Sequence, residues 1–436
     1  MGYLLLGILI AEAILIFFFN GKNLISPSFI ACSVFIFSTI MFLTSPDYYN
    51  YSLHSSTVIV ITALIFCLFL GEVLVRGLNY GNKLVCIKEK GEPVVIPFYL
   101  TIIFAVVVVT FGVFYFIEVY RYSLTVGNTS GNFLTMAKYV RDDGNFSKSF
   151  LISQGTLLSE CILYFAVYYY FFNKIVSGKR YFRYWIIILC YIPHILATDN
   201  RTNLLKAVAV ACIIAFFLIK QGSKWSRKKD KSIIIVSIIV LVIFFLLFRL
   251  LGYRTGTSIK NKDPWLNVVK YTSSSLVGID QYLCGALPSE VNLLFGERTL
   301  RNIYNILSEW GFTFPEISSV EGFFSYVSAE SNIYTGLKAY IQDYGFFGAG
   351  LSMFLWGAVV TGLLCRLKHH KVSFIGTTFL GIMFYPVLML SISDVTATVL
   401  GISSIYTFVY LALLEIVAHL FAVKDFGNGL NGGTVK

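Results

Sequence analysis

The sequence has little charge for its length, and this shortage decides its class. Of its 436 residues only 13% are Asp, Glu, Lys or Arg, whereas 57% are hydrophobic. Soluble domains carry about 25% charged residues. A chain this apolar cannot cover itself with polar surface in water, so we expect its solvent to be lipid.

The sequence also lacks the motifs of several common enzyme classes. It has no Walker-type glycine-rich loop, which argues against an ATP-driven motor, and no HExxH or EF-hand spacing. It has no GxSxG nucleophile elbow either. Its eight cysteines show no CxxC spacing, and only Cys284 falls in the predicted outer loop, so no disulfide framework is predicted there. We therefore expect no metal and no cofactor.

What the sequence has in abundance is long apolar runs. A helix that spans a bilayer takes about 17–25 residues. Runs of this kind lie at 3–19, 28–45, 57–76, 96–120, 150–172, 182–197, 203–219, 232–251, 340–364, 373–391 and 396–421. The first run follows no basic segment, and we expect it to be retained as a span. The predicted fold class is all-α, a polytopic integral membrane protein with about eleven transmembrane helices.

Basic loops set the predicted orientation of these spans. Lys and Arg concentrate in the links at 83–90, 174–183, 220–231 and 366–371, whereas the link 45–56 has neither. The basic links all fall on one side, which the positive-inside rule makes the cytoplasm. The N-terminus is then outside and the C-terminus inside. The net charge of +11 reflects this orientation and does not indicate a nucleic-acid partner.

The orientation divides the chain into four predicted parts. These are N-terminal transmembrane helices over 1–251, a large extracytoplasmic loop over 252–339, C-terminal transmembrane helices over 340–422 and a cytoplasmic tail over 423–436. The cytoplasmic links are too short to hold an enzyme that uses nucleotide-sugars. We therefore expect any chemistry on the outer face, with lipid-linked substrates.

An amphipathic helix is predicted inside the large loop. Leu300, Ile303, Tyr304 and Leu307 recur there at helical spacing, with polar residues on the opposite face. Arg298 and Arg301 belong to that polar face. They are candidates for binding an anionic substrate, with a solvated helix face as the alternative.

Further basic candidates lie at the outer ends of the spans. The polar link 198–203 contains Arg201, and Lys206 follows in an apolar run, where an ionisable group is costly. Arg249 and Arg254 flank the outer end of the eighth run. The planar guanidinium group binds two phosphate oxygens at once, so these residues predict a phosphate site. The alternatives are an ion pair of Arg201 with Asp199 and arginines that reach the lipid headgroups.

Acidic candidates lie just before and at the start of the ninth span. Glu330 or Asp343, near the mouth of that span, is a candidate general base. Alternatively, Glu330 is a helix N-terminal charge, if the helix starts at Ser331. On such a helix Asn332 and Asp343 share a face with residues 336 and 340.

Two residues inside spans have mainly structural interpretations. Glu160 lies in the middle of the fifth run and is expected to pair with Lys206 of a neighbouring helix. His194 lies near the outer end of the sixth run and is expected to be a core histidine.

In order along the chain, these motifs resemble the Wzy-type oligosaccharide repeat-unit polymerases, also called O-antigen or capsule polymerases. The matching stretches cover about the last half of the chain. They are the polar link 198–203, Tyr-Thr-Ser-Ser-Ser at 271–275, Asp-Gln-Tyr at 280–282, Phe-Gly-Glu-Arg-Thr at 295–299, Asn-Ile-Tyr-Thr at 332–335 and Asp-Tyr-Gly at 343–345. Ser331 stands where the related O-antigen ligases typically carry His before Asn, which favours a polymerase.

The resemblance implies a GT-C-like membrane glycosyltransferase on the outer face of the bacterial inner, or plasma, membrane. Its substrate would be an oligosaccharide linked to undecaprenyl pyrophosphate, and a chain-length regulator is a possible partner. A sugar hydroxyl would attack the anomeric carbon of the lipid-linked chain and release undecaprenyl pyrophosphate.

The same resemblance implies roles for the candidate residues. The pyrophosphate would be bound by Arg201, Arg254, Arg298 and Arg301, with Lys206 in support. The base would be Glu330 or Asp343. Asn332, Tyr334 and Arg249 would contact the substrate.

Two other functions are open at this point. A flippase for lipid-linked oligosaccharides fits the number of spans, but transporters typically carry internal repeats and midplane charges, and here the polar groups concentrate on one face. An O-antigen ligase would differ from the polymerase only in its acceptor.

Overall fold

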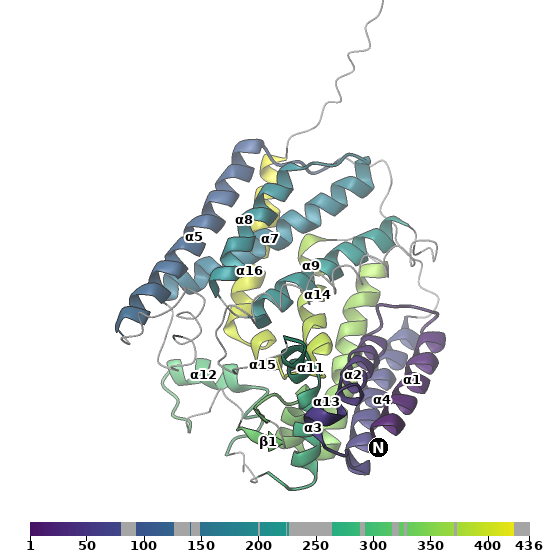
Figure 1. The fold of residues 1–436 in the computed structure, drawn as a ribbon. Coiled ribbons are helices and arrows are strands. Elements are labelled where there is room, and N and C mark those ends of the chain that lie inside the picture. The colour runs from purple at the N-terminus through teal and green to yellow at the C-terminus, as the bar shows by residue number, and fades with distance from the viewer. Residues whose placement is uncertain are drawn as a thin grey trace, which may run out of the picture.

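The computed structural model describes residues 1–79, 93–125, 140, 149–198, 201–223, 225, 264–287, 293–315, 322–326, 329–369 and 373–422. Over these ranges the protein is a bundle of α-helices with one hairpin of two short strands (Figure 1). Seven of the described helices are long and apolar enough to cross a membrane, and two shorter apolar helices accompany them. The protein is therefore an all-α polytopic membrane protein.

The predicted runs coincide with helices wherever the chain is described. They are α1 (Gly2–Phe19), α2 (Pro27–Leu43), α4 (Ser55–Leu78), α5 (Phe98–Thr125), α7 (Phe150–Ser177), α8 (Arg183–Thr198), α9 (Arg201–Gly222), α13 (Gly336–His369), α14 (Phe374–Met389) and α16 (Ile402–Phe421). The run 232–251 lies outside the described residues. The last run is interrupted, because the short helix α15 (Thr396–Val399) ends before α16 begins.

Local sequence explains where several helices begin and end. Ser26 precedes α2, which starts with Pro27, and its hydroxyl accepts the amide of Phe29. Ser373 caps α14 by accepting the amide of Gly376 at 3.0 Å. Gly178 ends α7 in the left-handed conformation, with φ of 71°. These are the usual Ser caps at helix starts and Gly caps at helix ends.

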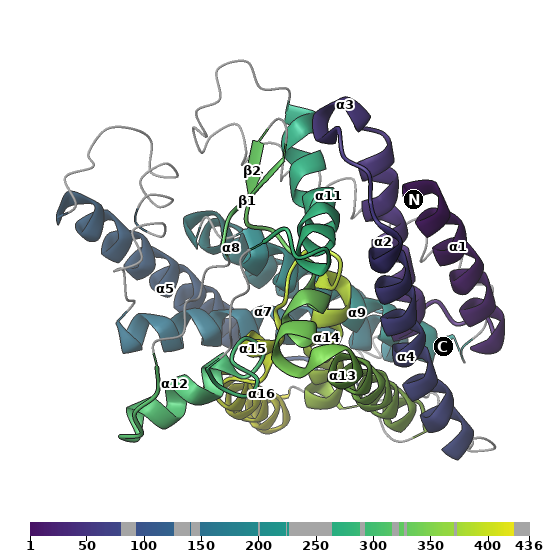
Figure 2. The same cartoon turned by 90° about the horizontal axis from the view of Figure 1, so that it is seen from below.

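The large loop sends a buried helix into the end of the bundle. Helix α11 (Pro264–Leu283) is buried from residue 272 to residue 280 and packs against α2 and α4. Ser38 donates a hydrogen bond to the Thr272 carbonyl, and Ser275 donates one to the Ser391 carbonyl, each at 2.5 Å. Figure 2 shows α11 between α2 and the hairpin of β1 (Phe324–Tyr326) and β2 (Ala329–Ser331).

The predicted amphipathic helix of the loop is confirmed as α12 (Arg301–Glu309). It lies beside α15 and α16, away from α11 (Figure 2), and none of its residues is buried. The loop therefore has two different parts, a helix packed into the core and a helix on the surface.

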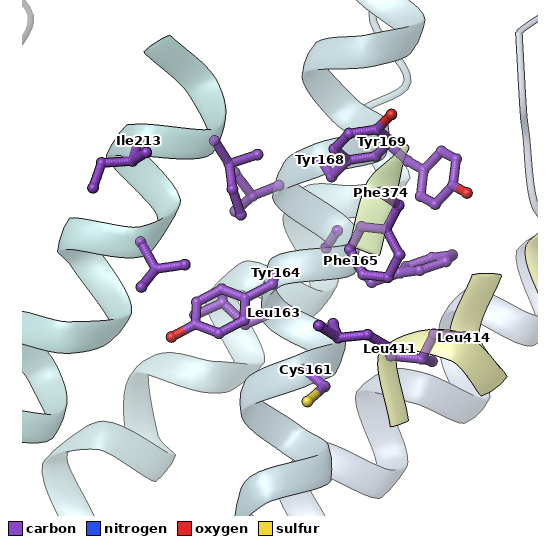
Figure 3. Packing of buried hydrophobic residues seen from close by; sticks show 14 of the residues in the cluster. Cys161, Leu163, Tyr164, Phe165, Tyr168, Tyr169, Ile213, Phe374, Leu411 and Leu414 are labelled. Atoms are coloured by element: carbon purple, nitrogen blue, oxygen red, sulfur yellow. The ribbon is translucent and has the colours of Figure 1, made fainter. Parts of the chain in front are cut away.

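Aromatic side chains of α7 form the centre of one hydrophobic core. Phe165, Tyr168 and Tyr169 gather around Phe374 of α14, with ring centroids 5.3 to 5.8 Å from that ring (Figure 3). Tyr164 points the other way, toward α9. Large aromatic rings of this kind supply much of the buried area that holds neighbouring helices together.

The closest helix crossing joins α4 and α13 through two glycines. A Cβ atom at Gly71 would lie 2.0 Å from the carbonyl oxygen of Phe354, and one at Gly357 would lie 2.1 Å from that of Leu68. Because those atoms belong to the backbone, a side chain at either position would clash with the neighbouring helix unless the two helices moved apart. Small residues allow this backbone approach in membrane helices.

Helix α13 is kinked at Gly345, whose φ of 67° and ψ of −179° are not helical. The kink separates a short segment, 336–344, from a long segment, 346–369. Few residues other than glycine adopt this φ without strain. The predicted span 340–364 thus includes the kink.

The structure corrects the prediction for the residues before α13. Glu330 lies in β2, Asn332 follows that strand, and the helix begins only at Gly336. Asn332 therefore does not share a helical face with Asp343, and Glu330 is not a helix N-terminal charge. The pairing of β1 with β2 keeps residues 329–331 extended, and the amide of Gly336 donates to the Leu390 carbonyl at 2.8 Å.

Candidate functional site

Two of the predicted motifs are in direct contact. Both oxygens of Asp343 accept the amide of Arg298, at 3.0 and 3.2 Å, and one accepts the amide and the hydroxyl of Thr299, at 2.8 and 2.7 Å. The Thr299 hydroxyl also lies 2.6 Å from the hydroxyl of Tyr344. The carboxylate thus fixes the turn from which Arg298 and Arg301 project.

A glycine makes this turn possible. Gly296 has φ of 68°, and a Cβ there would lie 2.8 Å from both Leu300 and the Tyr344 hydroxyl. The positive φ starts a turn in which the Leu300 amide donates to the Gly296 carbonyl at 2.8 Å. The amides of the two residues before Leu300 are then left for Asp343. Local sequence therefore sets up the anchoring of the arginines.

Asp394 adds a second carboxyl group to the same region. It lies in the link between α14 and α15 and accepts the amide of Thr396 at 2.9 Å. Burial raises the pKa of Asp394 to about 6; Asp343 acts in the same direction, while the hydrogen bonds from Thr396 and the charge of Arg301 act against it. A carboxyl group with this pKa exchanges its proton near neutral pH.

We call Arg298, Arg301, Asp343 and Asp394 the four-charge cluster. Its parts are joined by further hydrogen bonds, since Asn302 of α12 donates to the Ala397 carbonyl at 2.6 Å. The sequence analysis missed Asp394. The sequence feature that could have indicated it is the position of Asp394 as the single carboxylate in the short link between the last two apolar runs.

The pairing of Glu160 with Lys206 is confirmed. Lys206 Nζ lies 3.0 Å from Glu160 Oε1, and both side chains are largely buried. Leu205 packs against the cluster of Tyr385, Met389 and Val395, so the start of α9 lies near the link that carries Asp394. The start of α9, which carries Lys206, therefore lies at the same end of the bundle as Asp394.

Three predicted arginines cannot be placed in the site. Arg201 opens α9, but its side chain lies outside the part of the chain that the structure describes. Arg249 and Arg254 lie outside the described residues altogether. Their roles stay predictions.

The residues around β2 are only partly exposed. Glu330 is exposed, and its backbone carbonyl accepts the Lys270 ammonium at 2.5 Å. Tyr334 is buried, and its ring lies 3.8 Å from the ammonium of Lys338, which is only 3% exposed. Tyr334 therefore stabilises a buried cation that the sequence analysis did not single out. Asn332 is half-buried between them.

His194 is a buried core residue, as predicted. Its ring stacks on Tyr191 with centroids 5.2 Å apart.

Comparison with known proteins identifies no relative, so the chemistry of the site is inferred from its residues alone. No protein-family model, no curated protein and no solved structure matches the chain.

The four-charge cluster combines two chemical abilities. Guanidinium groups recognise phosphate oxygens, and here the turn that carries them is fixed by Asp343. A carboxyl group that exchanges its proton near neutral pH can take a proton from a hydroxyl. A site with both abilities suits group transfer from a phosphorylated substrate.

Proposed function

We propose that the protein is a membrane glycosyltransferase that polymerises lipid-linked oligosaccharide repeat units on the outer face of a bacterial plasma membrane. The observation that carries the proposal is the meeting of Arg298 and Arg301 with Asp343 and Asp394 at the end of a membrane bundle. The same proposal includes about eleven spans, a GT-C-like architecture and an N-terminus on the outer face.

The reaction needs cations where negative charge develops. A sugar hydroxyl attacks the anomeric carbon of the lipid-linked chain, and the bond from that carbon to the pyrophosphate oxygen breaks with its electron pair. Arg298 and Arg301 bind the departing undecaprenyl pyrophosphate, supported by Lys206. Charge stabilisation of this type is usually the largest catalytic contribution, and loss of one donor costs about a hundred- to a thousand-fold in rate.

The attacking hydroxyl also needs a base. Asp343 already accepts hydrogen bonds from Arg298 and Thr299, so in this proposal it positions the arginines. Asp394, whose pKa is raised to about 6, accepts the hydroxyl proton. Glu330 remains an alternative base, because it is exposed and belongs to the same large loop.

The test is polymer length in cells whose own copy of the gene is deleted and replaced by a variant. We expect Arg301→Ala and Asp394→Asn to abolish high-mass glycan and to leave single lipid-linked repeat units exposed on the outer face. Lys179→Ala is the matched control, since Lys179 is exposed in the link after α7, and it should leave the polymer unchanged. Membrane levels of all variants are compared first.

Other results would replace the proposal. Full-length polymer in both Arg298→Ala and Arg301→Ala would remove the arginines from the reaction. Lipid-linked units accumulating on the inner face of the deletion strain would indicate a flippase. Normal polymer that fails to reach its final acceptor would indicate a ligase.

A further inference from the structure

A separate polar group lies where the link between α3 (Pro46–Tyr49) and α4 meets α11. Its centre is the fully buried carboxylate of Asp280. The carboxylate accepts the hydroxyls of Tyr51 and Thr57, at 2.7 and 2.6 Å, and the backbone amide of His54 at 2.8 Å. These three donors come from the neighbouring segment and hold Asp280 in place.

The same carboxylate also holds the ring of His54. His54 Nδ1 lies 2.7 Å from Asp280 Oδ2, while the His54 side chain is 58% exposed. Burial acts to raise the pKa of Asp280, but the hydrogen bonds from Thr57, His54 and Tyr51 outweigh it and hold that pKa below its usual value. A buried carboxylate held by three donors thus orients an exposed imidazole.

A thiol completes the group. Cys284 follows Asp280 by one helical turn, and its amide donates to the Asp280 carbonyl at 3.0 Å. Its side chain is exposed, and its Sγ lies 4.0 Å from the Ser56 hydroxyl. One ring nitrogen of His54, one Asp280 oxygen and Cys284 Sγ all lie within 4.8 Å of one another.

We propose that His54, Asp280 and Cys284 bind a divalent transition-metal ion of the zinc type. Imidazole nitrogen, thiolate sulfur and carboxylate oxygen are the ligands that zinc takes in proteins, at about 2.0 to 2.3 Å. The ion takes the place of the proton between His54 Nδ1 and Asp280 Oδ2, and the exposed Cys284 side chain closes on it. Neutral His54 then carries its ring proton on Nε2, binding releases the thiol proton of Cys284, and water completes the coordination.

The surroundings of the site support the proposal. Tyr51, Thr57 and the His54 amide keep their hydrogen bonds to Asp280, so one ligand is held rigidly before the ion arrives. Partners of this kind, bonded to the ligands themselves, tune metal affinity. Sequence spacing did not predict the site because the fold brings His54 to residues more than two hundred positions away. The proposal does not depend on the proposed glycosyl transfer.

Cobalt(II) binding to the purified full-length protein tests the site directly. Cobalt bound to a thiolate gives a sulfur-to-cobalt charge-transfer absorption band, and we expect zinc to remove it by competition. Cys284→Ser should abolish the band, and His54→Gln should weaken cobalt binding by at least about tenfold. Both side chains are exposed, so both variants should fold.

Cys190→Ser and His419→Gln are the matched controls, because neither residue lies in the group, and both should keep the band. Zinc should raise the melting temperature of the wild type and not that of Cys284→Ser. Absence of the band in the wild type would overturn the proposal. So would a band of equal strength in Cys284→Ser or unchanged cobalt binding in His54→Gln.

Discussion

At the scale of single residues, two carboxyl groups of the four-charge cluster differ in their surroundings. Asp343 accepts hydrogen bonds from the backbone amides of Arg298 and Thr299. Asp394 is buried next to it and accepts hydrogen bonds from Thr396 alone among the described residues, so its ionised form is disfavoured. Asp343 thus anchors the turn that carries the arginines, whereas burial makes Asp394 the candidate proton acceptor.

This difference predicts a pH-dependent stability for Asp394→Asn. The folded-state pKa is raised from 3.8 to about 6, so folding favours the protonated form of Asp394. The stability that this form contributes is complete below about pH 4 and is lost as the pH rises through 6. At pH 7.5 the ionised group therefore costs stability, and removing its charge should raise the free energy of unfolding by about 2 to 3 kcal/mol.

Thermal unfolding in detergent at pH 4, 6 and 7.5 measures this effect. The gain of Asp394→Asn over the wild type should be largest at pH 7.5 and should vanish near pH 4. A gain that is the same at all three values would show that the charge is not its cause.

A second residue-scale prediction concerns Glu72, which is fully buried in α4. Its carboxylate accepts hydrogen bonds from the side chains of Asn20 and Ser26, at 2.8 and 2.6 Å, and from the amide of Ser28. Arg76 lies 3.6 Å away. Glu72→Ala leaves these donors and one cation without their partner, and it should lower the free energy of unfolding by about 3 kcal/mol.

Chemical unfolding of the purified protein is the measurement for Glu72→Ala. Asp47→Ala, at an exposed position of α3, is the control and should change stability by less than about 0.5 kcal/mol. Equal stability of the two variants would mean that the hydrogen bonds around Glu72 do not hold α1 and α2 to α4.

At the scale of elements, the crossing of α4 and α13 gives a matched pair of substitutions in one helix. Gly357 faces the backbone of Leu68, whereas a Cβ at Gly362 would meet no atom within 4 Å. Gly357→Ala forces the backbones apart and should cost at least about 2 kcal/mol. Gly362→Ala keeps the packing and should stabilise the helix by about 0.5 to 1 kcal/mol.

Melting temperature and the amount of inserted protein distinguish the two variants. If Gly357→Ala is inserted and melts like Gly362→Ala, the helices do not cross as closely as described.

Elements were predictable where one physical requirement dominated. Length and apolarity were enough to find α1, α5 and α7, since a bilayer span needs both. Helix α11 was missed because hydroxyl-rich residues 272–275 look like a polar loop, and their burial depends on hydrogen-bond partners in the link after α14 and in β2. The kink at Gly345 was missed because an isolated glycine inside an apolar run has no unique meaning.

The candidate site was predictable only in part, for the same reason. Arg298, Arg301 and Asp343 could be selected because charge is rare in this chain. That the backbone at Arg298 would bond to Asp343 could not be predicted, because this contact depends on the turn at Gly296 and on the kinked helix α13. Asp394 and His54 acquire chemical interest only from residues far away in the sequence.

At the scale of the whole molecule, sidedness is the property that links the two sites. His54, Cys284 and the four-charge cluster belong to segments that the basic-loop pattern assigns to the outer face. The same pattern assigns Lys179, in the link between α7 and α8, to the opposite face.

A membrane-impermeant thiol reagent applied to intact cells tests this arrangement. The native Cys284 is the exposed cysteine among the described residues, so it should be labelled. A Lys179→Cys variant that also carries Cys284→Ser should be labelled only after the cells are opened. Labelling of that variant in intact cells would show that the orientation is the reverse of the predicted one and that both sites face the cytoplasm.

The kink at Gly345 has a mechanical consequence for an enzyme in a fluid membrane. Helices tilt when bilayer thickness changes. Segment 346–369 of α13 can take up such a tilt. The kink at Gly345 separates this segment from Asp343, which lies on the other side of the kink and is bonded to residues 298–299. We therefore expect the geometry around the arginines to be insulated from membrane thickness, so that the same site can work in bilayers of different lipid composition.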